Sequence, residues 1–333
     1  MDGLDSLKVL RTACGFAESG RHAAAVAFLG QRPSEQLAAS PTLSLVFGTA
    51  KARQGEYDTG DHWVHLALER SRTVGDGRVE ARALNVLGAI RLETGRIDDA
   101  AAFFEEALAA AGNLGDHATV GRCSNNLGII EHLRGRLAQA IGAFTRAISA
   151  FDRVDLKRGV VEGKHNLGIA YRDQGELRRA LDAADDAVRL AEQERDQGLL
   201  AQTRAGRAEI CVLRGDARLA RREIDAAIEA HRAVNDPVGE AEDLRILGAV
   251  YLADGEQVAA EHVLRDVLVR AERLERPLLA ACAGRDLARL LARCHHPQDA
   301  AEVAASARET FAALGAERQV EQMDQLLAAL DIP

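Results

Sequence analysis

Aromatic residues make up only 4% of the 333 residues, and proline occurs just six times. β-Sandwiches and barrels draw on aromatic and β-branched side chains, so this shortage argues against an all-β fold. The chain is rich instead in Ala, Leu, Arg and Glu, which favour helices. Composition therefore predicts an all-α protein of stacked helices with almost no strand.

Paired cysteines and long apolar runs are also missing. The five cysteines are odd in number, widely spaced and without a C-x-x-C motif: Cys14, Cys123, Cys211, Cys282 and Cys294. This pattern predicts reduced thiols in a cytoplasmic protein.

The first residues, MDGLDSLKVLRTACGF, lack the basic region and apolar core of a signal peptide. No stretch approaches the 18 or so apolar residues of a membrane span, so we expect no membrane partner.

Lysine and net positive charge are scarce as well. Only four of the 42 basic residues are lysines, and this arginine bias suggests a GC-rich bacterial genome. The formal net charge of −9 argues against a dedicated nucleic-acid surface, because binding phosphates needs clustered basic side chains. We therefore expect no nucleic-acid partner.

A motif recurs every forty residues along the chain. Residues 125–141 read NNLGIIEHLRGRLAQAI, and residues 165–181 read HNLGIAYRDQGELRRAL. Stepping by forty from the glycine of LRGRL gives Gly55, Gly95, Gly135, Gly175, Gly215, Gly255 and His295. Glycine suits the left-handed backbone that ends a helix, and His is among the residues that tolerate it. Each repeat is therefore predicted to be two helices joined by a tight turn.

Small residues recur at three more positions of the repeat, which predicts close contact between the paired helices. The first position holds Gly48, Gly88, Gly128, Gly168, Ala208, Gly248 and Ala288. Twelve residues later come Gly60, Ala100, Ala140, Ala180, Ala220, Ala260 and Ala300. Seven residues further on come Ala67, Ala107, Ala147, Ala187, Ala227, Val267 and Ala307.

Helix start signals share this period. Asp76, Asp116, Asp196 and Asp236 precede the first helix of their repeats and are predicted to cap it. Pro237 and Pro277 suit the first helical position.

These residues resemble the tetratricopeptide repeat (TPR), although the period is forty instead of 34 and the usual Trp and late Pro are missing. The longer form is similar to the repeats of LGN-type adaptors, kinesin light chains and bacterial Rap-like regulators. The resemblance implies a right-handed α-solenoid of about eight helix pairs plus a C-terminal capping helix. We expect one solenoid over residues 1–333: a degenerate first repeat at 1–40, seven repeats at 41–313 and a cap at 316–331.

The first helix of each pair lines the concave groove in this repeat family. Positions that would face the groove in the central repeats are polar, and we select as peptide- or partner-binding candidates Arg82, Asn85, Arg122, Asn125, Asn126, His132, His165, Asn166 and Arg172. An Asn amide both donates and accepts, which suits a peptide backbone, and Arg suits a carboxylate. By resemblance, Asn126 and Asn166 contact the peptide. The alternative is that these Asn residues bond to a neighbouring helix and order the stack.

Catalytic and metal motifs are not found in the sequence. GVVEGK at 159–164 is one residue short of a phosphate loop. The cluster Cys294, His295 and His296 fits a modified turn better than a metal site. We therefore predict a non-catalytic peptide- or protein-binding scaffold without cofactor or metal. The alternatives are a Rap-like sensor that acts through a partner and, less favoured, an enzyme using His132, His165 and Asp173. Homo-oligomers stay open.

Overall fold

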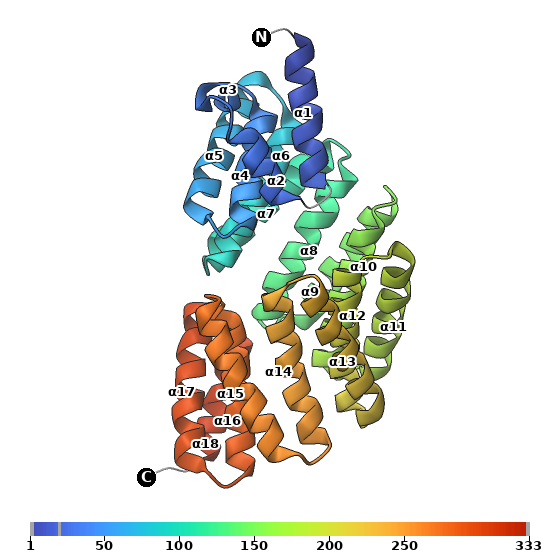
Figure 1. Ribbon diagram of the computed structural model, residues 1–333, viewed down its shortest axis with the longest axis vertical. Coiled ribbons are helices and arrows are strands. Elements are labelled where there is room, and N and C mark those ends of the chain that lie inside the picture. Colours follow the sequence, from blue (N-terminus) through green and yellow to red (C-terminus); the bar gives the residue numbers. More distant parts are fainter. Residues whose placement is uncertain (1–2, 19–20, 331–333) are drawn as a thin grey trace. The chain divides into compact units, whose positions relative to one another are not determined.

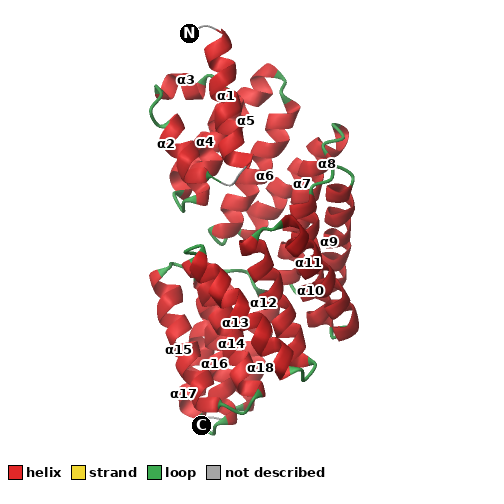
Figure 2. Ribbon diagram, turned by 45° about the vertical axis from the view of Figure 1, so that its right-hand side comes forward, coloured by secondary structure: helices red, strands yellow, loops and turns green. Residues whose placement is uncertain are grey.

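The computed structural model describes residues 3–18 and 21–330 (Figures 1 and 2). These residues form eighteen helices and no strand. The predicted all-α architecture of consecutive stacked helices is therefore confirmed. Within the same residues, no helix is long and apolar enough to cross a membrane.

Three helices come first: α1 (Gly3–Glu18), α2 (His22–Leu29) and the short α3 (Ser34–Ala38). The next fourteen helices form seven pairs: α4 (Pro41–Arg53) and α5 (Tyr57–Val74), α6 (Gly77–Glu93) and α7 (Ile97–Asn113), α8 (His117–Leu133) and α9 (Leu137–Asp152), α10 (Lys157–Gln174) and α11 (Leu177–Glu194), α12 (Gln197–Leu213) and α13 (Ala217–Ala233), α14 (Pro237–Ala253) and α15 (Gln257–Arg273), α16 (Pro277–Arg293) and α17 (Pro297–Ala313). Helix α18 (Glu317–Ala329) follows them.

The helices group by their internal contacts into two compact units. Unit 1 is Met1–Leu127 and unit 2 is Gly128–Pro333, so the boundary lies inside α8. The single solenoid over residues 1–333, with its division into repeats and cap, stays a prediction.

The turn inside each pair has the predicted left-handed backbone. Gly135 has φ of 75°, and His295, which replaces glycine in the last pair, has φ of 59°. A second set of left-handed residues, not foreseen from the sequence, joins one pair to the next. Four of these are not glycine: Asp155, Arg195, Asn235 and Glu275.

The predicted aspartate caps are also confirmed. The Asp76 and Asp196 carboxylates accept from the backbone N–H of Val79 and Leu199 at 3.1 Å. Asp116 accepts from the Thr119 N–H at 3.2 Å and Asp236 from the Gly239 N–H at 3.0 Å. Pro237 and Pro277 occupy the start of α14 and α16 as expected.

The small residues of the repeat are buried where paired helices meet. Ala100, Ala140 and Ala220 are fully buried. A Cβ at Gly128 of α8 would lie 2.5 Å from Cε1 of the Phe144 ring, on α9 of the same pair. Gly20, Ala25 and Leu29 carry the pattern of the predicted degenerate first repeat; Ala25 and Leu29 are fully buried, and Gly20 lies outside the described residues. The pairs are thus held together at positions where only small side chains fit.

Helix α18 packs an apolar side against the preceding helices. Met323 is fully buried beside Phe311 of α17, and Val320, Leu326 and Leu327 pack against the same cluster. Leu133, at the end of α8, belongs to this cluster as well. The last helix therefore contacts the first part of unit 2 as well as its neighbour α17.

Two glycine substitutions test the close packing. We expect Gly128→Ala to lower the free energy of unfolding by about 1–3 kcal/mol, because the new methyl group overlaps the Phe144 ring. Gly142→Ala, in the next helix, meets nothing within 4 Å and should raise it by about 0.5–1 kcal/mol through helix propensity. Urea denaturation measures both, and equal changes in the two variants would contradict the packing argument.

Candidate binding surface

The first helices of successive pairs line the inner side of unit 2. Helix α10 contacts α12, α12 contacts α14, and α14 contacts α16. The successive second helices α11, α13, α15 and α17 share no comparable contacts among the described residues. In a curved stack of repeats, helices on the inside of the curve approach one another most closely. The sides of α10, α12, α14 and α16 that meet therefore form the inner face of unit 2.

A row of charged side chains runs along this inner face. Arg172 of α10 donates to Glu209 of α12. Arg245 of α14 bridges two carboxylates, donating to Glu209 and to Asp286 of α16 at 2.8 Å each. Arg285 donates to Asp286 at 2.9 Å. We call these five residues the charged row; it links four successive repeats through ion pairs.

The charged row is largely withdrawn from solvent. The side chains of Arg172 and Arg245 are each only 15% exposed, and those of Glu209 and Asp286 are 20% and 18% exposed. Burial opposes the charged form of Glu209, but Arg172 and Arg245 outweigh it and lower its pKa to about 2. In the same way, Arg285 and Arg245 outweigh the burial of Asp286 and lower its pKa to about 2. Both carboxylates are therefore charged at neutral pH.

Asp173 joins the row to the last helix. Its carboxylate contacts Nε2 of His132 at 3.0 Å and accepts from Nε of Arg172 at 2.8 Å. Arg318 of α18, 145 residues away, donates to the Asp173 carboxylate and, at 3.1 Å, to its backbone carbonyl. Burial opposes the charge of Asp173, but His132 and Arg172 hold the pKa of this carboxyl well below its usual range. Helix α18 is thereby bound to α10.

His165 is half-buried in the same face. Its ring lies so close to Gly206 of α12 that a Cβ there would be 2.6 Å from Cε1. Burial lowers the pKa of His165 to about 4, so the ring is neutral at neutral pH. Asn166, the next residue on α10, is half-buried.

The candidates in unit 1 differ in how deeply they are buried. Asn126 of α8 donates to Oδ1 of Asn85 on α6 at 3.3 Å, and Sγ of Cys123 contacts the same oxygen at 3.4 Å. Asn125 is half-buried, while Arg82 and Arg122 are exposed. The Asn85–Asn126 bond ties two first helices together, which is the ordering role weighed above as the alternative to peptide contact.

Charged side chains continue along the inner face beyond the candidates selected from the sequence. The charged row continues through Glu209, Arg245 and Asp286. The forty-residue register carried this signal, because Arg245 and Arg285 follow Asn85, Asn125 and His165 in it, while Asp286 follows Asn126 and Asn166. The contact of Arg318 with Asp173 had no such signal, because α18 lies outside the repeats.

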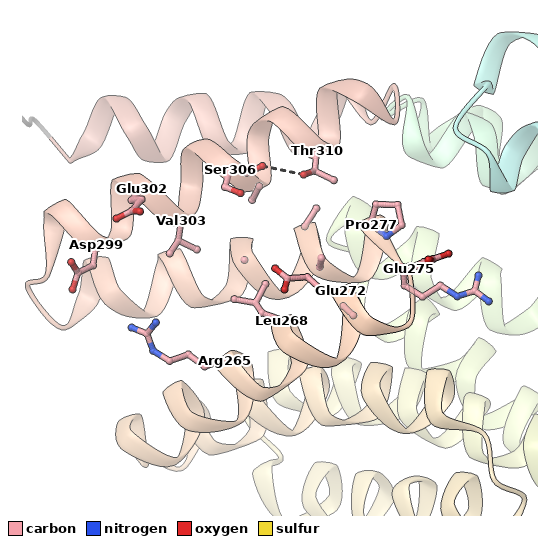
Figure 3. Close-up of a pocket in the computed structure, with 16 residues that line it drawn as sticks. Arg265, Leu268, Glu272, Glu275, Pro277, Asp299, Glu302, Val303, Ser306 and Thr310 are labelled. Atoms are coloured by element: carbon pink, nitrogen blue, oxygen red, sulfur yellow. Dashed lines mark hydrogen bonds between the residues drawn. The ribbon is translucent and has the colours of Figure 1, made fainter.

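A cleft of about 840 Å³ lies elsewhere in unit 2, among α15, α16 and α17 (Figure 3). Leu268, Gly284, Val303 and Ala307 are among its apolar lining. Its charged lining residues are Arg265, Glu272, Glu275, Arg276, Asp299 and Glu302. It contains none of the predicted candidates. Among residues 3–18 and 21–330, no three His, Cys, Asp or Glu side chains gather as a metal site would require.

The paired helices, their recurring small residues and the polar inner face define a TPR protein. The family model of the MalT-like TPR region matches residues 10–277, and the chain belongs to this family. Comparison with curated protein sequences finds no match.

Solved structures show the same fold at low sequence identity. A Rap protein complexed with competence and sporulation factor is 12% identical, with 98% of each chain covered and a TM-score of 0.67. The Rap conjugation gene regulator of plasmid pLS20, in complex with the Phr* peptide, is 15% identical, with 86% of this chain and 76% of that chain covered and a TM-score of 0.63. The apo quorum sensor NprR from B. thuringiensis is 13% identical, with 98% of each chain covered and a TM-score of 0.58.

Removing the central arginine of the charged row should destabilise unit 2. We expect Arg245→Leu to lower the free energy of unfolding by about 2–3 kcal/mol, because Glu209 and Asp286 each lose a partner while largely buried. Arg189→Leu is the matched control: Arg189 pairs with Asp186 on the exposed side of α11, where an ion pair contributes at most about 1 kcal/mol. Similar losses in both variants would show that the row is no stronger than a surface pair.

The charged row also predicts a pH dependence. The lowered pKa values of Glu209 and Asp286 contribute stability that is complete above their ordinary values of 4.5 and 3.8 and is lost as pH falls toward about 2. We expect the free energy of unfolding to fall more steeply over this interval in the wild type than in Arg245→Leu. Urea denaturation at a series of pH values measures both slopes; parallel slopes would contradict the assignment.

Proposed function

We propose that this protein is a non-catalytic module that binds a peptide segment, free or within a partner protein, on the inner face of unit 2. The observation that carries the proposal is the polar character of this face. Successive first helices meet there through Arg172, Glu209 and Arg245, whereas the two helices of a pair meet through apolar side chains. Such a face offers fixed hydrogen-bonding groups to a peptide backbone. The compartment that suits this function and the reduced cysteines is the cytoplasm.

Two of the similar structures are complexes: the Rap protein with competence and sporulation factor, and the pLS20 regulator with the Phr* peptide. Their fold supports a peptide ligand here. The proposed contacts in unit 2 are His132, His165, Asn166 and Arg172. In unit 1 the corresponding proposal covers Arg82, Asn85, Arg122, Asn125 and Asn126.

The proposal includes no catalysis, because the acid–base candidates are poorly suited to proton transfer. Asp173 is held charged by His132, Arg172 and Arg318, so it is a weak base near neutral pH. His165 is neutral and packed against Gly206.

A single substitution tests the peptide proposal. Peptides retained from a pool of random octapeptides are identified by mass spectrometry, and their affinities are measured by calorimetry. We expect Asn166→Ala to weaken binding about tenfold, the effect of removing a well-placed interface hydrogen bond. Gln139→Ala, on the exposed side of α9, is the control and should bind as the wild type does. Unchanged affinity in Asn166→Ala would remove this residue from the site.

A second candidate function, a sensor, is favoured by the contact between Arg318 and Asp173. A ligand on the inner face that alters this contact would change how α18 is held, and a partner of α18 would respond. The sensor thus adds an output to the same binding surface.

Hydrogen exchange tests the sensor. We expect Arg318→Gln to raise exchange of the α18 amides, because the helix loses its bonds to Asp173. The control Arg308→Gln removes an exposed ion pair between Arg308 of the adjacent α17 and Asp324 of α18. It should raise exchange of the α18 amides less than Arg318→Gln does. In the wild type, binding of a selected octapeptide should change hydrogen exchange of the α18 amides. Unchanged exchange on peptide binding would argue for a scaffold in which α18 does not respond to the ligand.

A further inference from the structure

Three arginines meet where α16 faces α18. Arg285 and Arg289 are four residues apart on α16, and Arg318 and Gln322 are four apart on α18, so each pair shares one helix face. Nη2 of Arg289 donates to Oε1 of Gln322 at 2.9 Å, which brings the two faces together. We call Arg285, Arg289, Arg318 and Gln322 the arginine junction.

The junction has more positive charge than its carboxylates balance. Asp286 is shared between Arg245 and Arg285. Asp173 is shared among His132, Arg172 and Arg318. Arg289 bonds to the neutral amide of Gln322. Counting the charged row, the junction and Asp173 together, arginines exceed their hydrogen-bonded carboxylates by two: Arg172, Arg245, Arg285, Arg289 and Arg318 against Asp173, Glu209 and Asp286.

The surplus charge is within reach of a ligand. Arg289 is exposed, while the side chains of Arg285 and Arg318 are 17% and 24% exposed. Burial of part of the Arg289 side chain, together with the charges of Arg285 and Arg318, lowers the pKa of Arg289. A bound anion would relieve this repulsion, and guanidinium groups fit a carboxylate through two parallel hydrogen bonds.

We propose that the arginine junction binds a carboxylate of the peptide on the inner face of unit 2, with Arg289 as the principal contact. This inference rests on the proposed function and adds the chemistry of the ligand: an acidic side chain or a free C-terminus. The family model ends at residue 277, so the junction lies beyond the region that it matches.

The test uses the full chain and octapeptides selected from the random pool. Each peptide is made with a free C-terminus, with an amidated C-terminus, and with its acidic residues changed to amides. Affinities are measured for the wild type, Arg289→Gln and the control Arg189→Gln, whose exposed arginine lies on α11. Succinate is a separate probe for a small free anion. Matching melting temperatures show that both variants are folded.

We expect the wild type and Arg189→Gln to prefer the carboxylate-bearing peptide at least tenfold, which corresponds to one charge-assisted hydrogen bond. Arg289→Gln should abolish that preference. Loss on amidation assigns the C-terminus to the junction, and loss on removing acidic side chains assigns a side chain.

Other outcomes overturn the inference. Peptides that bind equally well with and without carboxylates overturn it while leaving the proposed function intact. Arg289-dependent binding of succinate without binding of any peptide overturns both proposals, and so does the absence of all binding. A carboxylate preference that survives in Arg289→Gln also overturns the inference, because the carboxylate is then held elsewhere.

Discussion

Close approach of the two helices in each pair is the constraint on which the rest of the structure depends. At Gly128 and Gly88, a phenylalanine ring from the other helix of the pair occupies the space that a Cβ would need. The contact can form only with the helices in one axial register, because a shift along the axis would bring larger side chains together. The left-handed turn then fixes the start of the second helix. This axial register therefore determines where each residue of the inner face lies.

Burying the side chains of the charged row costs free energy. Taking Arg172, Glu209 and Arg245 out of water costs several kcal/mol for each ion, and their mutual attraction repays this only with good geometry. Apolar residues would stabilise the same contacts at lower cost, as they do between α4 and α5, where Gly48 packs against Val64. A row of partly buried charges is therefore weak evidence for stability. The row is better explained by specificity of helix pairing. Each charged side chain finds an opposite charge on a neighbouring helix, and an arrangement that placed two carboxylates together would be unfavourable.

The sequence predicted the frame well and the site less completely. Periodic signals predicted the helix pairs, the turn at His295 and the cap at Asp236, because each depends on local chemistry within one repeat. The register that located Asn85 and Asn126 could also have located Arg245 and Asp286. Sequence alone does not say whether a polar residue meets a ligand or a neighbouring helix, since both uses suit an Asn or Arg. Contacts from outside the repeats, such as that of Arg318, have no periodic signal.

That contact changes how unit 2 responds to binding. In an open stack each repeat touches only its neighbours, so a displacement at one end reaches the other through every interface between them. In unit 2, α18 also binds α10 through Arg318 and Asp173, which gives a second and direct route. Arg318 lies four residues from Gln322, which accepts from Arg289 of α16. A group that competes for Arg289 or Arg318 therefore acts on α10, α16 and α18 together. An anion at this junction would thus act where the two ends of the unit are joined, which makes peptide recognition and regulation properties of the same few side chains.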